Sequence, residues 1–215
     1  MANFWIEEGE TILFIGDSIT DCGRRNAEMP LGNGYVRVFS ELITARFPEI
    51  NIAYINKGIG GNRVTDLRDR WTDDVVYHRP DRLSIKIGIN DLHSHLRSVD
   101  EAVSPEVFLE TYERILARTR DEIGCPVLLI TPFYISIEST LDTLRGSVKS
   151  LLPKYIDIVE GLSVKYNTRL VNLQNVFETQ LMHRDADFFC PEPVHPNRAG
   201  HIVIADALLT ELSDK

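Results

Sequence analysis

The sequence predicts a doubly wound α/β protein, a three-layer sandwich in which a parallel sheet is covered by helices on both faces. Short apolar runs alternate with longer amphipathic segments along the 215 residues. Alternation of this kind is typical of βαβ units, which build parallel sheets. Glycine and polar residues follow several of the apolar runs, at the sheet edge where open α/β folds bind ligands.

The short apolar runs predict five buried strands of one sheet. They are Thr11–Ile15, Ile52–Ile55, Arg82–Ile87, Val127–Thr131 and Arg169–Val171. The longer segments between and after them predict helices over Tyr35–Phe47, Thr65–His78, Pro105–Ile123, Thr140–Tyr166 and Asn197–Leu212. In the last of these, Ile202, Ala205 and Leu209 lie at helical spacing on one face. No repeat or linker divides the chain, so we expect a single domain over residues 1–215.

Composition and charge exclude several classes of protein. The hydrophobic fraction of 43% and the charged fraction of 26% are those of an ordinary globular chain, not of a disordered or collagen-like one. The formal net charge of −9 disfavours partners that carry a dense negative charge, both nucleic acid and an anionic membrane surface. A small neutral or cationic substrate fits this charge better.

The cysteines and the N-terminus predict the compartment. Cys22, Cys125 and Cys190 are widely spaced and odd in number, without a CxxC or Cys/His cluster for zinc. The first ten residues carry acidic side chains where a signal peptide has a basic and then an apolar region. We therefore expect a reduced, cytoplasmic protein. The sequence is compatible with a homo-oligomer but does not fix the number of subunits.

Ser18 follows the first expected strand within Gly16-Asp17-Ser18. A glycine at this point permits a sharp turn that presents the serine hydroxyl at the edge of the sheet. By itself the motif favours an ordinary turn or helix cap, and it lacks the second glycine of the G-x-S-x-G nucleophile elbow.

Two further motifs follow the second and third strands. Gly58, Gly60 and Gly61 lie in one short loop, where backbone N–H groups can turn toward a ligand or the loop can simply be flexible. Asn90 comes directly after the third strand, where its side chain can cap the next segment or donate a hydrogen bond to an oxyanion.

His195 lies three residues after Glu192, in a proline-rich turn before the last helix. A lone loop histidine is usually a surface residue. Here a carboxylate can reach the imidazole Nδ1 and leave Nε2 free as a base. A serine nucleophile needs such a base and such an acid. Ser18, His195 and Glu192 are therefore candidate catalytic residues, and the N–H groups of Ser18 and Gly61 with the Asn90 amide are candidate oxyanion donors.

Taken together, four blocks resemble the motifs of the SGNH (GDSL-type) hydrolase family, in the family's order and at similar separations. They are Gly16-Asp17-Ser18, Asn56-x-Gly58-x-x-Gly61-Asn62, Gly88-x-Asn90-Asp91 and His195-Pro196-Asn197. The resemblance implies a flavodoxin-like sheet, Ser18 as nucleophile, His195 as base, and Gly61 and Asn90 as oxyanion donors with the Ser18 amide. It also implies that no metal or organic cofactor takes part.

Further blocks are similar to the small intracellular acetylxylan-esterase branch of that family, among them Gly32-x-Gly34-Tyr35-Val36 and Arg70-Trp71-x-x-Asp74-Val75. This resemblance implies a serine esterase that removes acetyl groups from carbohydrate, such as xylo-oligosaccharides, through an acyl-enzyme. Two alternatives stay open: a lysophospholipase or thioesterase of the same family, and a non-catalytic carbohydrate-binding protein on this fold.

The chain departs from the family at the triad acid, because the family usually has D-x-x-H and this sequence has Glu192. Three outcomes are open: Glu192 replaces the aspartate, another acid such as Asp187 serves, or Ser18 and His195 act as a weakened dyad. We favour replacement by Glu192.

Residues beside the four blocks are candidates for substrate contacts: Asp17, Asn62, Arg63, Asp91 and Tyr134. Asp17 is also expected to accept hydrogen bonds within its turn. Asp91, His93 and His95 are spaced as metal ligands can be, but no third histidine or cysteine cluster lies nearby in the sequence. We expect a polar loop at the rim of the sheet there, and no metal site.

Overall fold

The computed structural model of the chain describes residues 4–98, 101–138 and 140–213. Its centre is a five-stranded, wholly parallel sheet with the strand order β2-β1-β3-β4-β5. The strands are β1 (Thr11–Gly16), β2 (Ala53–Gly58), β3 (Arg82–Lys86), β4 (Val127–Ile130) and β5 (Arg169–Val171). All five expected strands are confirmed, with ends that differ from the expected ones by three residues or fewer.

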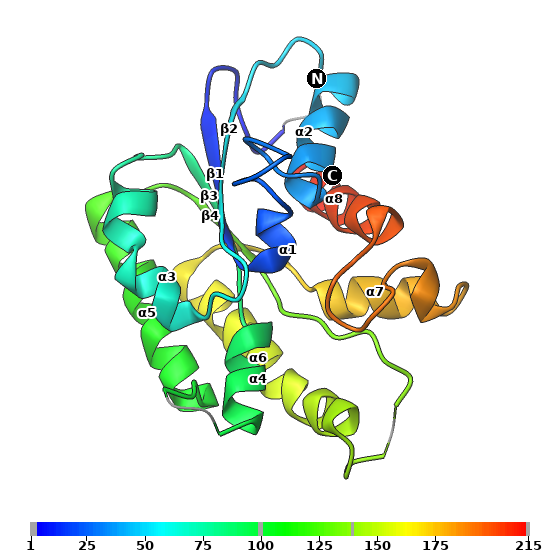
Figure 1. The fold of residues 1–215 in the computed structure, drawn as a ribbon. Coiled ribbons are helices and arrows are strands. Elements are labelled where there is room, and N and C mark those ends of the chain that lie inside the picture. Colours follow the sequence, from blue (N-terminus) through cyan, green and yellow to red (C-terminus); the bar gives the residue numbers. More distant parts are fainter. Residues whose placement is uncertain (1–3, 99–100, 139, 214–215) are drawn as a thin grey trace.

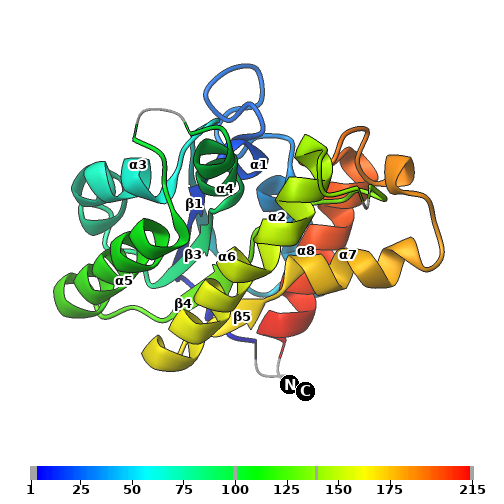
Figure 2. The same ribbon diagram turned by 90° about the horizontal axis from the view of Figure 1, so that it is seen from below.

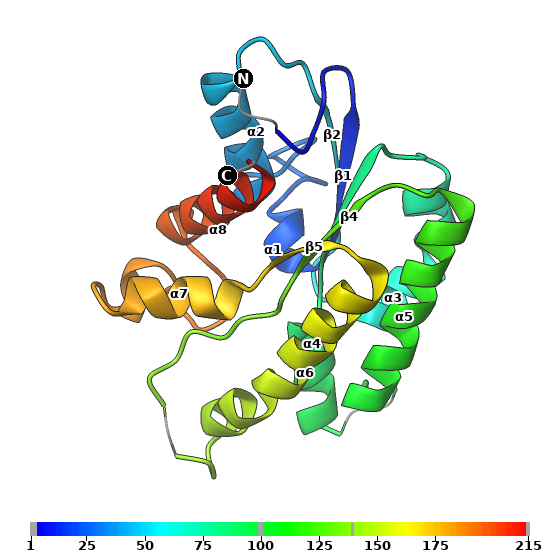
Figure 3. The ribbon, with the colours of Figure 1, turned by 180° about the vertical axis from the view of Figure 1, so that it is seen from behind.

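Helices cover both faces of the sheet, as Figures 1 and 3 show from opposite sides. On one face α2 (Tyr35–Arg46) packs against α8 (Arg198–Leu212), and α7 (Leu173–Leu181) lies against α8. On the other face α3 (Val64–Asp69) contacts α5 (Pro105–Glu122), which in turn contacts α6 (Leu144–Tyr166). The expected three-layer fold is therefore confirmed.

The apolar character of the strands follows from this double cover. Ile12, Leu13, Phe14 and Ile15 are all fully buried, although successive side chains of a strand point to opposite faces. Strands buried on both faces are apolar throughout rather than alternating. The described core residues form one continuous hydrophobic cluster.

The two ends of the described chain meet. The backbone N–H of Trp5 donates to the carbonyl of Leu212 at 2.9 Å, and Phe4 forms an isolated antiparallel bridge with Ser213. Figure 2 looks at the layers from below and shows α3 and α5 on one side of the strands and α2 and α8 on the other.

The expected helix over Thr65–His78 is wrong in one respect, because two shorter elements replace it. The helix α3 ends at Asp69, and a separate π-helical turn covers Thr72–Val76. At the break, the side chain of Arg70 turns back and donates to Asn62 Oδ1 and to the carbonyl of Lys57, both at 2.8 Å.

Three α-helices and one 3₁₀-helix were not expected from the sequence: α1 (Ser18–Asp21), α4 (Ile89–Leu96), α7 and η2 (Ala186–Phe188). The largest correction is α4, because the polar loop expected around Asp91, His93 and His95 is a helix. Gly88 precedes it with a φ of 135°, a backbone conformation that favours glycine, and this residue turns the chain from β3 into the helix.

Candidate active site

The chemistry-bearing residues lie at the carboxyl ends of β1, β2 and β3, and in the turn before α8. Ser18 is the first residue of α1, directly after β1. A Cβ on Gly16 would collide with the Lys86 carbonyl and with Thr20 Oγ1, so the close approach of β1, β3 and α1 requires glycine at this point. The Ser18 side chain is partly exposed, as access to a substrate demands.

Ser18 Oγ lies 2.8 Å from His195 Nε2, across 177 residues of sequence. On the other side of the same ring, His195 Nδ1 is in short contact with Glu192 Oε1. Ser18, His195 and Glu192 thus form one continuous chain of hydrogen bonds. Because Nδ1 faces a carboxylate, the neutral ring carries its proton there and leaves Nε2 to accept from the serine hydroxyl.

The loop that carries the acid holds its carboxylate firmly. Glu192 Oε1 also accepts from the backbone N–H of His195 at 2.8 Å, and Oε2 accepts from that of Val194 at 3.1 Å. The carbonyl of Pro193 accepts from the N–H of Ile135 at 2.9 Å, which fastens the loop to the segment after β4. Glu192 therefore occupies the position at His195 Nδ1 that we expected it to take in place of the family's aspartate. Asp187 is exposed and has no hydrogen bond to His195 among the described contacts.

Donors for an oxyanion lie beside this chain. Within the part of the chain that the structure describes, no acceptor is hydrogen-bonded to the backbone N–H of Ser18 or Gly61. Gly61 has a φ of 82°, in the left-handed region, and is exposed. Asn90 Nδ2 donates one hydrogen to the carbonyl of Asn62 at 3.1 Å, and an amide nitrogen carries a second hydrogen for a further acceptor.

The structure contradicts two of the expected substrate contacts. Asp17 and Asp91 are both 0% exposed, so neither carboxylate reaches a bound molecule. Asp17 caps α1 by accepting from the N–H of Ile19 at 3.0 Å. Asp91 Oδ1 accepts from the N–H of Val64 at 2.8 Å, while burial raises the pKa of this carboxyl to about 7. Both side chains hold the loops of the site rather than line it.

The other three candidates for substrate contacts, Asn62, Arg63 and Tyr134, are less deeply buried, and each contacts another residue of the chain. Asn62 Oδ1 accepts from Arg70, and Arg63 donates to the carbonyl of Glu101 at 2.8 Å. The Arg63 side chain is 20% exposed and the residue Tyr134 only 6%. The Tyr134 ring meets the His93 ring edge-on, with the two centroids 6.1 Å apart.

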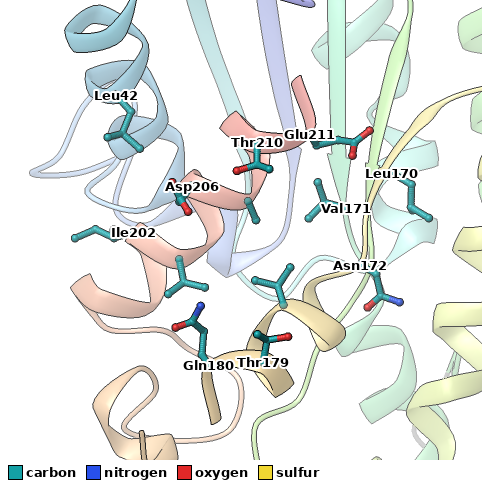
Figure 4. A pocket seen from close by; sticks show the side chains of 13 residues that line it. Leu42, Leu170, Val171, Asn172, Thr179, Gln180, Ile202, Asp206, Thr210 and Glu211 are labelled. Atoms are coloured by element: carbon teal, nitrogen blue, oxygen red, sulfur yellow. The ribbon is translucent and has the colours of Figure 1, made fainter. Parts of the chain in front are cut away.

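A cavity of about 350 Å³ adjoins Glu192, and Asp187, named from the sequence as an alternative acid, is among the residues that line it. Two further lining residues, Arg145 from α6 and Asp185, were missed by the sequence reasoning. No motif marks these residues, because their placement depends on how the α6 and α7 regions approach the loop of Glu192. A second pocket of about 590 Å³ lies between α2, β5, α7 and α8, and its lining includes none of the residues of the triad chain (Figure 4).

Among the described residues, no group of three or more His, Cys, Asp or Glu side chains could hold a metal ion. His93 and His95 lie two positions apart on α4, and such residues point in different directions around a helix. Of the described helices, none is both long and apolar enough to cross a membrane.

A serine hydrogen-bonded to a histidine that is itself held by a carboxylate, at the edge of a doubly wound sheet, defines the class of a serine hydrolase. The comparison with protein families agrees. The model of the GDSL-like lipase/acylhydrolase family matches residues 14–203, and the chain belongs to this family. It is a carboxylic ester hydrolase.

Relatives support this assignment over nearly the whole chain. An acetylxylan esterase of Geobacillus stearothermophilus is 38% identical over 217 residues, which cover 96% of this chain and 95% of that protein. The crystal structure of Axe2, an acetylxylan esterase from that organism, superposes with a TM-score of 0.86 at 36% identity, covering 98% of this chain and 97% of that one. LAE5, an α/β hydrolase enzyme from the metagenome of Lake Arreo in Spain, gives a TM-score of 0.87 at 31% identity and covers 98% of each chain.

Three further structures of Axe2 bear directly on the triad. They are catalytic mutants in which a serine, an aspartate or a histidine is replaced by alanine. That enzyme therefore has an aspartate among its catalytic residues, whereas the chain described here presents Glu192 to its histidine.

Proposed function

We propose that this protein removes acetyl groups from acetylated xylo-oligosaccharides, with Ser18 as nucleophile, His195 as general base and acid, and Glu192 as the triad acid. The single observation that carries the proposal is the unbroken hydrogen-bond chain from Ser18 Oγ through both nitrogens of His195 to Glu192. The relative of known activity, an acetylxylan esterase, supports the substrate class.

The reaction proceeds in two steps. Ser18 Oγ attacks the acetyl carbonyl carbon while His195 Nε2 takes the hydroxyl proton, and the same proton then goes to the departing sugar oxygen as the ester bond breaks. The products are a free sugar hydroxyl and acetylated Ser18. A water molecule, deprotonated by His195, attacks the acetyl group in turn, and its proton restores the serine hydroxyl as acetate leaves.

Negative charge develops on the carbonyl oxygen in both steps. We assign its stabilisation to the N–H groups of Ser18 and Gly61 and to the second Nδ2 hydrogen of Asn90. Their lack of other acceptors supports this assignment, because donors that are already oriented need no rearrangement when the charge forms. Removal of one such donor typically costs about 10²–10³ in kcat.

The cavity beside Glu192 suits the carbohydrate part of the substrate. Arg145, Asp185 and Asp187 supply both donors and acceptors, and sugar hydroxyls take part in both kinds of hydrogen bond. We further propose that the enzyme works in the cytoplasm, which the absence of disulfides among its three cysteines supports.

Hydrolysis of p-nitrophenyl acetate, butyrate and octanoate tests the proposal first, followed by acetate release from acetylated xylo-oligosaccharides. We expect acetate to be the preferred acyl group, and Ser18→Ala to lose turnover with every ester. A preference for octanoate would instead indicate a lysophospholipase or thioesterase. Binding of xylo-oligosaccharides without measurable turnover would indicate a carbohydrate-binding protein.

A further inference from the structure

A fully buried ion pair lies directly behind the nucleophile. Lys86, the last residue of β3, is 1% exposed, and Asp17 is 0% exposed. Lys86 Nζ lies 3.2 Å from Asp17 Oδ2 and 3.4 Å from Oδ1. Lysine is almost never fully buried unless it is paired, and neither of these side chains is open to a substrate.

The ion pair lies next to the backbone of Ser18, because Asp17 directly precedes Ser18 in the chain. Asp17 is the N-cap of α1, and Ser18 is the first residue of that helix. One oxygen of the Asp17 carboxylate, Oδ1, accepts from both the N–H of Ile19 and the Lys86 ammonium. In the sheet, Lys86 is paired with Gly16, so the lysine reaches over the strand end where the chain turns into the nucleophile.

Packing alone does not account for a lysine here. Leu83, Ile85 and Ile87 alternate with Lys86 and are fully buried on the opposite face of the sheet. Phe133, which lies beside Lys86, is also fully buried, so an apolar residue at position 86 would have apolar neighbours. The Lys86 ammonium itself lies over the ring of Phe133, with Nζ 5.4 Å from the ring centroid. Burial lowers the pKa of the lysine, while the charge of Asp17 and its hydrogen bond act in the opposite direction and favour the ammonium form.

The charge of Asp17 matters because the reaction places a second negative charge, that of the oxyanion, close to it. The Ser18 N–H is one of the proposed oxyanion donors, and it directly follows Asp17. A buried carboxylate without a counter-ion at this position would oppose the negative charge that forms on the substrate oxygen. The Lys86 ammonium neutralises it and leaves only the capping function.

We propose that Lys86 is a positioning residue for ester hydrolysis, one that neutralises and fixes the Asp17 cap so that Ser18 and its N–H are held for the transition state. This inference rests on the proposed function of Ser18. It assigns Lys86 no contact with substrate and no role in proton transfer.

Three variants test the inference with p-nitrophenyl acetate: Lys86→Met, Asp17→Asn, and the double variant Lys86→Met/Asp17→Asn. We expect Lys86→Met to lower kcat about tenfold to a hundredfold, less than the loss of a whole oxyanion donor, and to leave KM within about twofold. The double variant should recover most of this loss, because asparagine still accepts from the N–H of Ile19 and leaves no unpaired charge. Ser84→Ala, two residues earlier on the same face of β3 and also fully buried, is the matched control with unchanged kcat.

Each outcome is decisive. If Lys86→Met is folded and has the kcat of the wild type, or if the double variant is as slow as Lys86→Met, neutralisation of Asp17 is not its role. If Lys86→Met does not fold, the double variant decides alone: kcat near that of the wild type supports the inference, and a hundredfold loss in a folded double variant overturns it. An inactive wild type would refute the proposed function instead, so the two failures are distinguishable.

Discussion

Replacing the carboxylate of Glu192 tests the most unusual feature of the site. In Glu192→Gln the side-chain oxygen can still accept from the N–H of His195 and from Nδ1, so the ring keeps its orientation. Only the negative charge is lost. The change therefore isolates the stabilisation of the imidazolium that forms when His195 takes the serine proton.

The expected magnitude follows from the exposure of the pair. A hydrogen bond to a charged group contributes about 1.5–3 kcal/mol, against about 1 kcal/mol for a neutral one. The side chains of His195 and Glu192 are 57% and 45% exposed, so water screens their interaction and the lower part of this range applies. The two values then differ by about 0.5 kcal/mol. Since 1.36 kcal/mol corresponds to a factor of ten, we expect kcat to fall about twofold in Glu192→Gln, far below the ~10⁴ seen when a buried triad acid is neutralised.

Two more substitutions complete the series. Glu192→Ala removes the acceptor as well as the charge, leaves the His195 ring free to rotate, and should cost roughly 10²–10³ in kcat. Glu192→Asp keeps the charge but shortens the side chain by one C–C bond of about 1.5 Å, so a loss of no more than about tenfold is expected.

The assay is kcat and KM for p-nitrophenyl acetate, with Asp187→Asn as the matched control at an exposed carboxylate of the same region. Asp187→Asn should have the kcat of the wild type. The reasoning is refuted if Glu192→Ala has wild-type kcat, or if Asp187→Asn loses activity while Glu192→Gln keeps it.

Three further predictions concern the oxyanion site, the stability and the carbohydrate cavity. Asn90→Ala should lower kcat for p-nitrophenyl acetate about 10²–10³-fold with little change in KM, and an unchanged kcat would exclude Asn90 as an oxyanion donor. Burial lowers the pKa of His201 from 6.5 to about 4, so this group's stabilising contribution, on the order of 3 kcal/mol, is present above pH 6.5 and is lost as pH falls toward 4. Asp91 has the opposite sign, because its raised pKa makes stability fall, on the order of 4 kcal/mol, as pH rises from about 4 to about 7. Urea unfolding measures the free energy of unfolding across this pH range. Relative to the wild type, we expect His201→Asn to gain stability toward acid pH and Asp91→Asn to gain it toward neutral pH. A variant whose free energy of unfolding follows the wild type in parallel at every pH would contradict the role given to that residue. Arg145→Ala should raise KM for acetylated xylo-oligosaccharides severalfold and leave p-nitrophenyl acetate unaffected, whereas equal effects on both substrates would exclude a carbohydrate contact.

The sheet could be predicted from the sequence because its signal is local. Each strand is a short apolar run, and each is followed by the residues that a parallel sheet brings to its carboxyl edge. That rule brings Ser18, Gly61 and Asn90 to one edge of the sheet. His195, 177 positions after Ser18, follows no strand, and it was added from the chemistry of its turn with Glu192 and from the resemblance to the family.

The failures have a common physical cause, which is that burial depends on contacts distant in the sequence. Asp17 and Asp91 lie within the motifs and were expected to contact substrate, yet each is buried by partners that no local pattern shows. Asp17 meets Lys86, 69 positions later, and Asp91 meets the N–H of Val64, 27 positions earlier. The charge of Lys86 inside the expected buried strand Arg82–Ile87 was a visible sign in the sequence that a buried partner existed.

The helix α4 was missed for a related reason. The segment is rich in polar residues, as surface loops are. They are Asn90, Asp91, His93 and His95. In the structure, Leu92 is fully buried and Asp91 is buried against the start of α3, so tertiary packing stabilises a helix that local composition does not predict.

The central claim is that Ser18 carries the acetyl group during turnover. Rapid mixing with p-nitrophenyl acetate, an acid quench, and mass spectrometry of the peptide that contains Ser18 measure this directly. We expect one acetyl group on Ser18 in the wild type, formed with the release of p-nitrophenol and lost as acetate appears, and neither acetylation nor turnover in Ser18→Ala. Acetate release by a folded Ser18→Ala variant at the rate of the wild type would contradict the account.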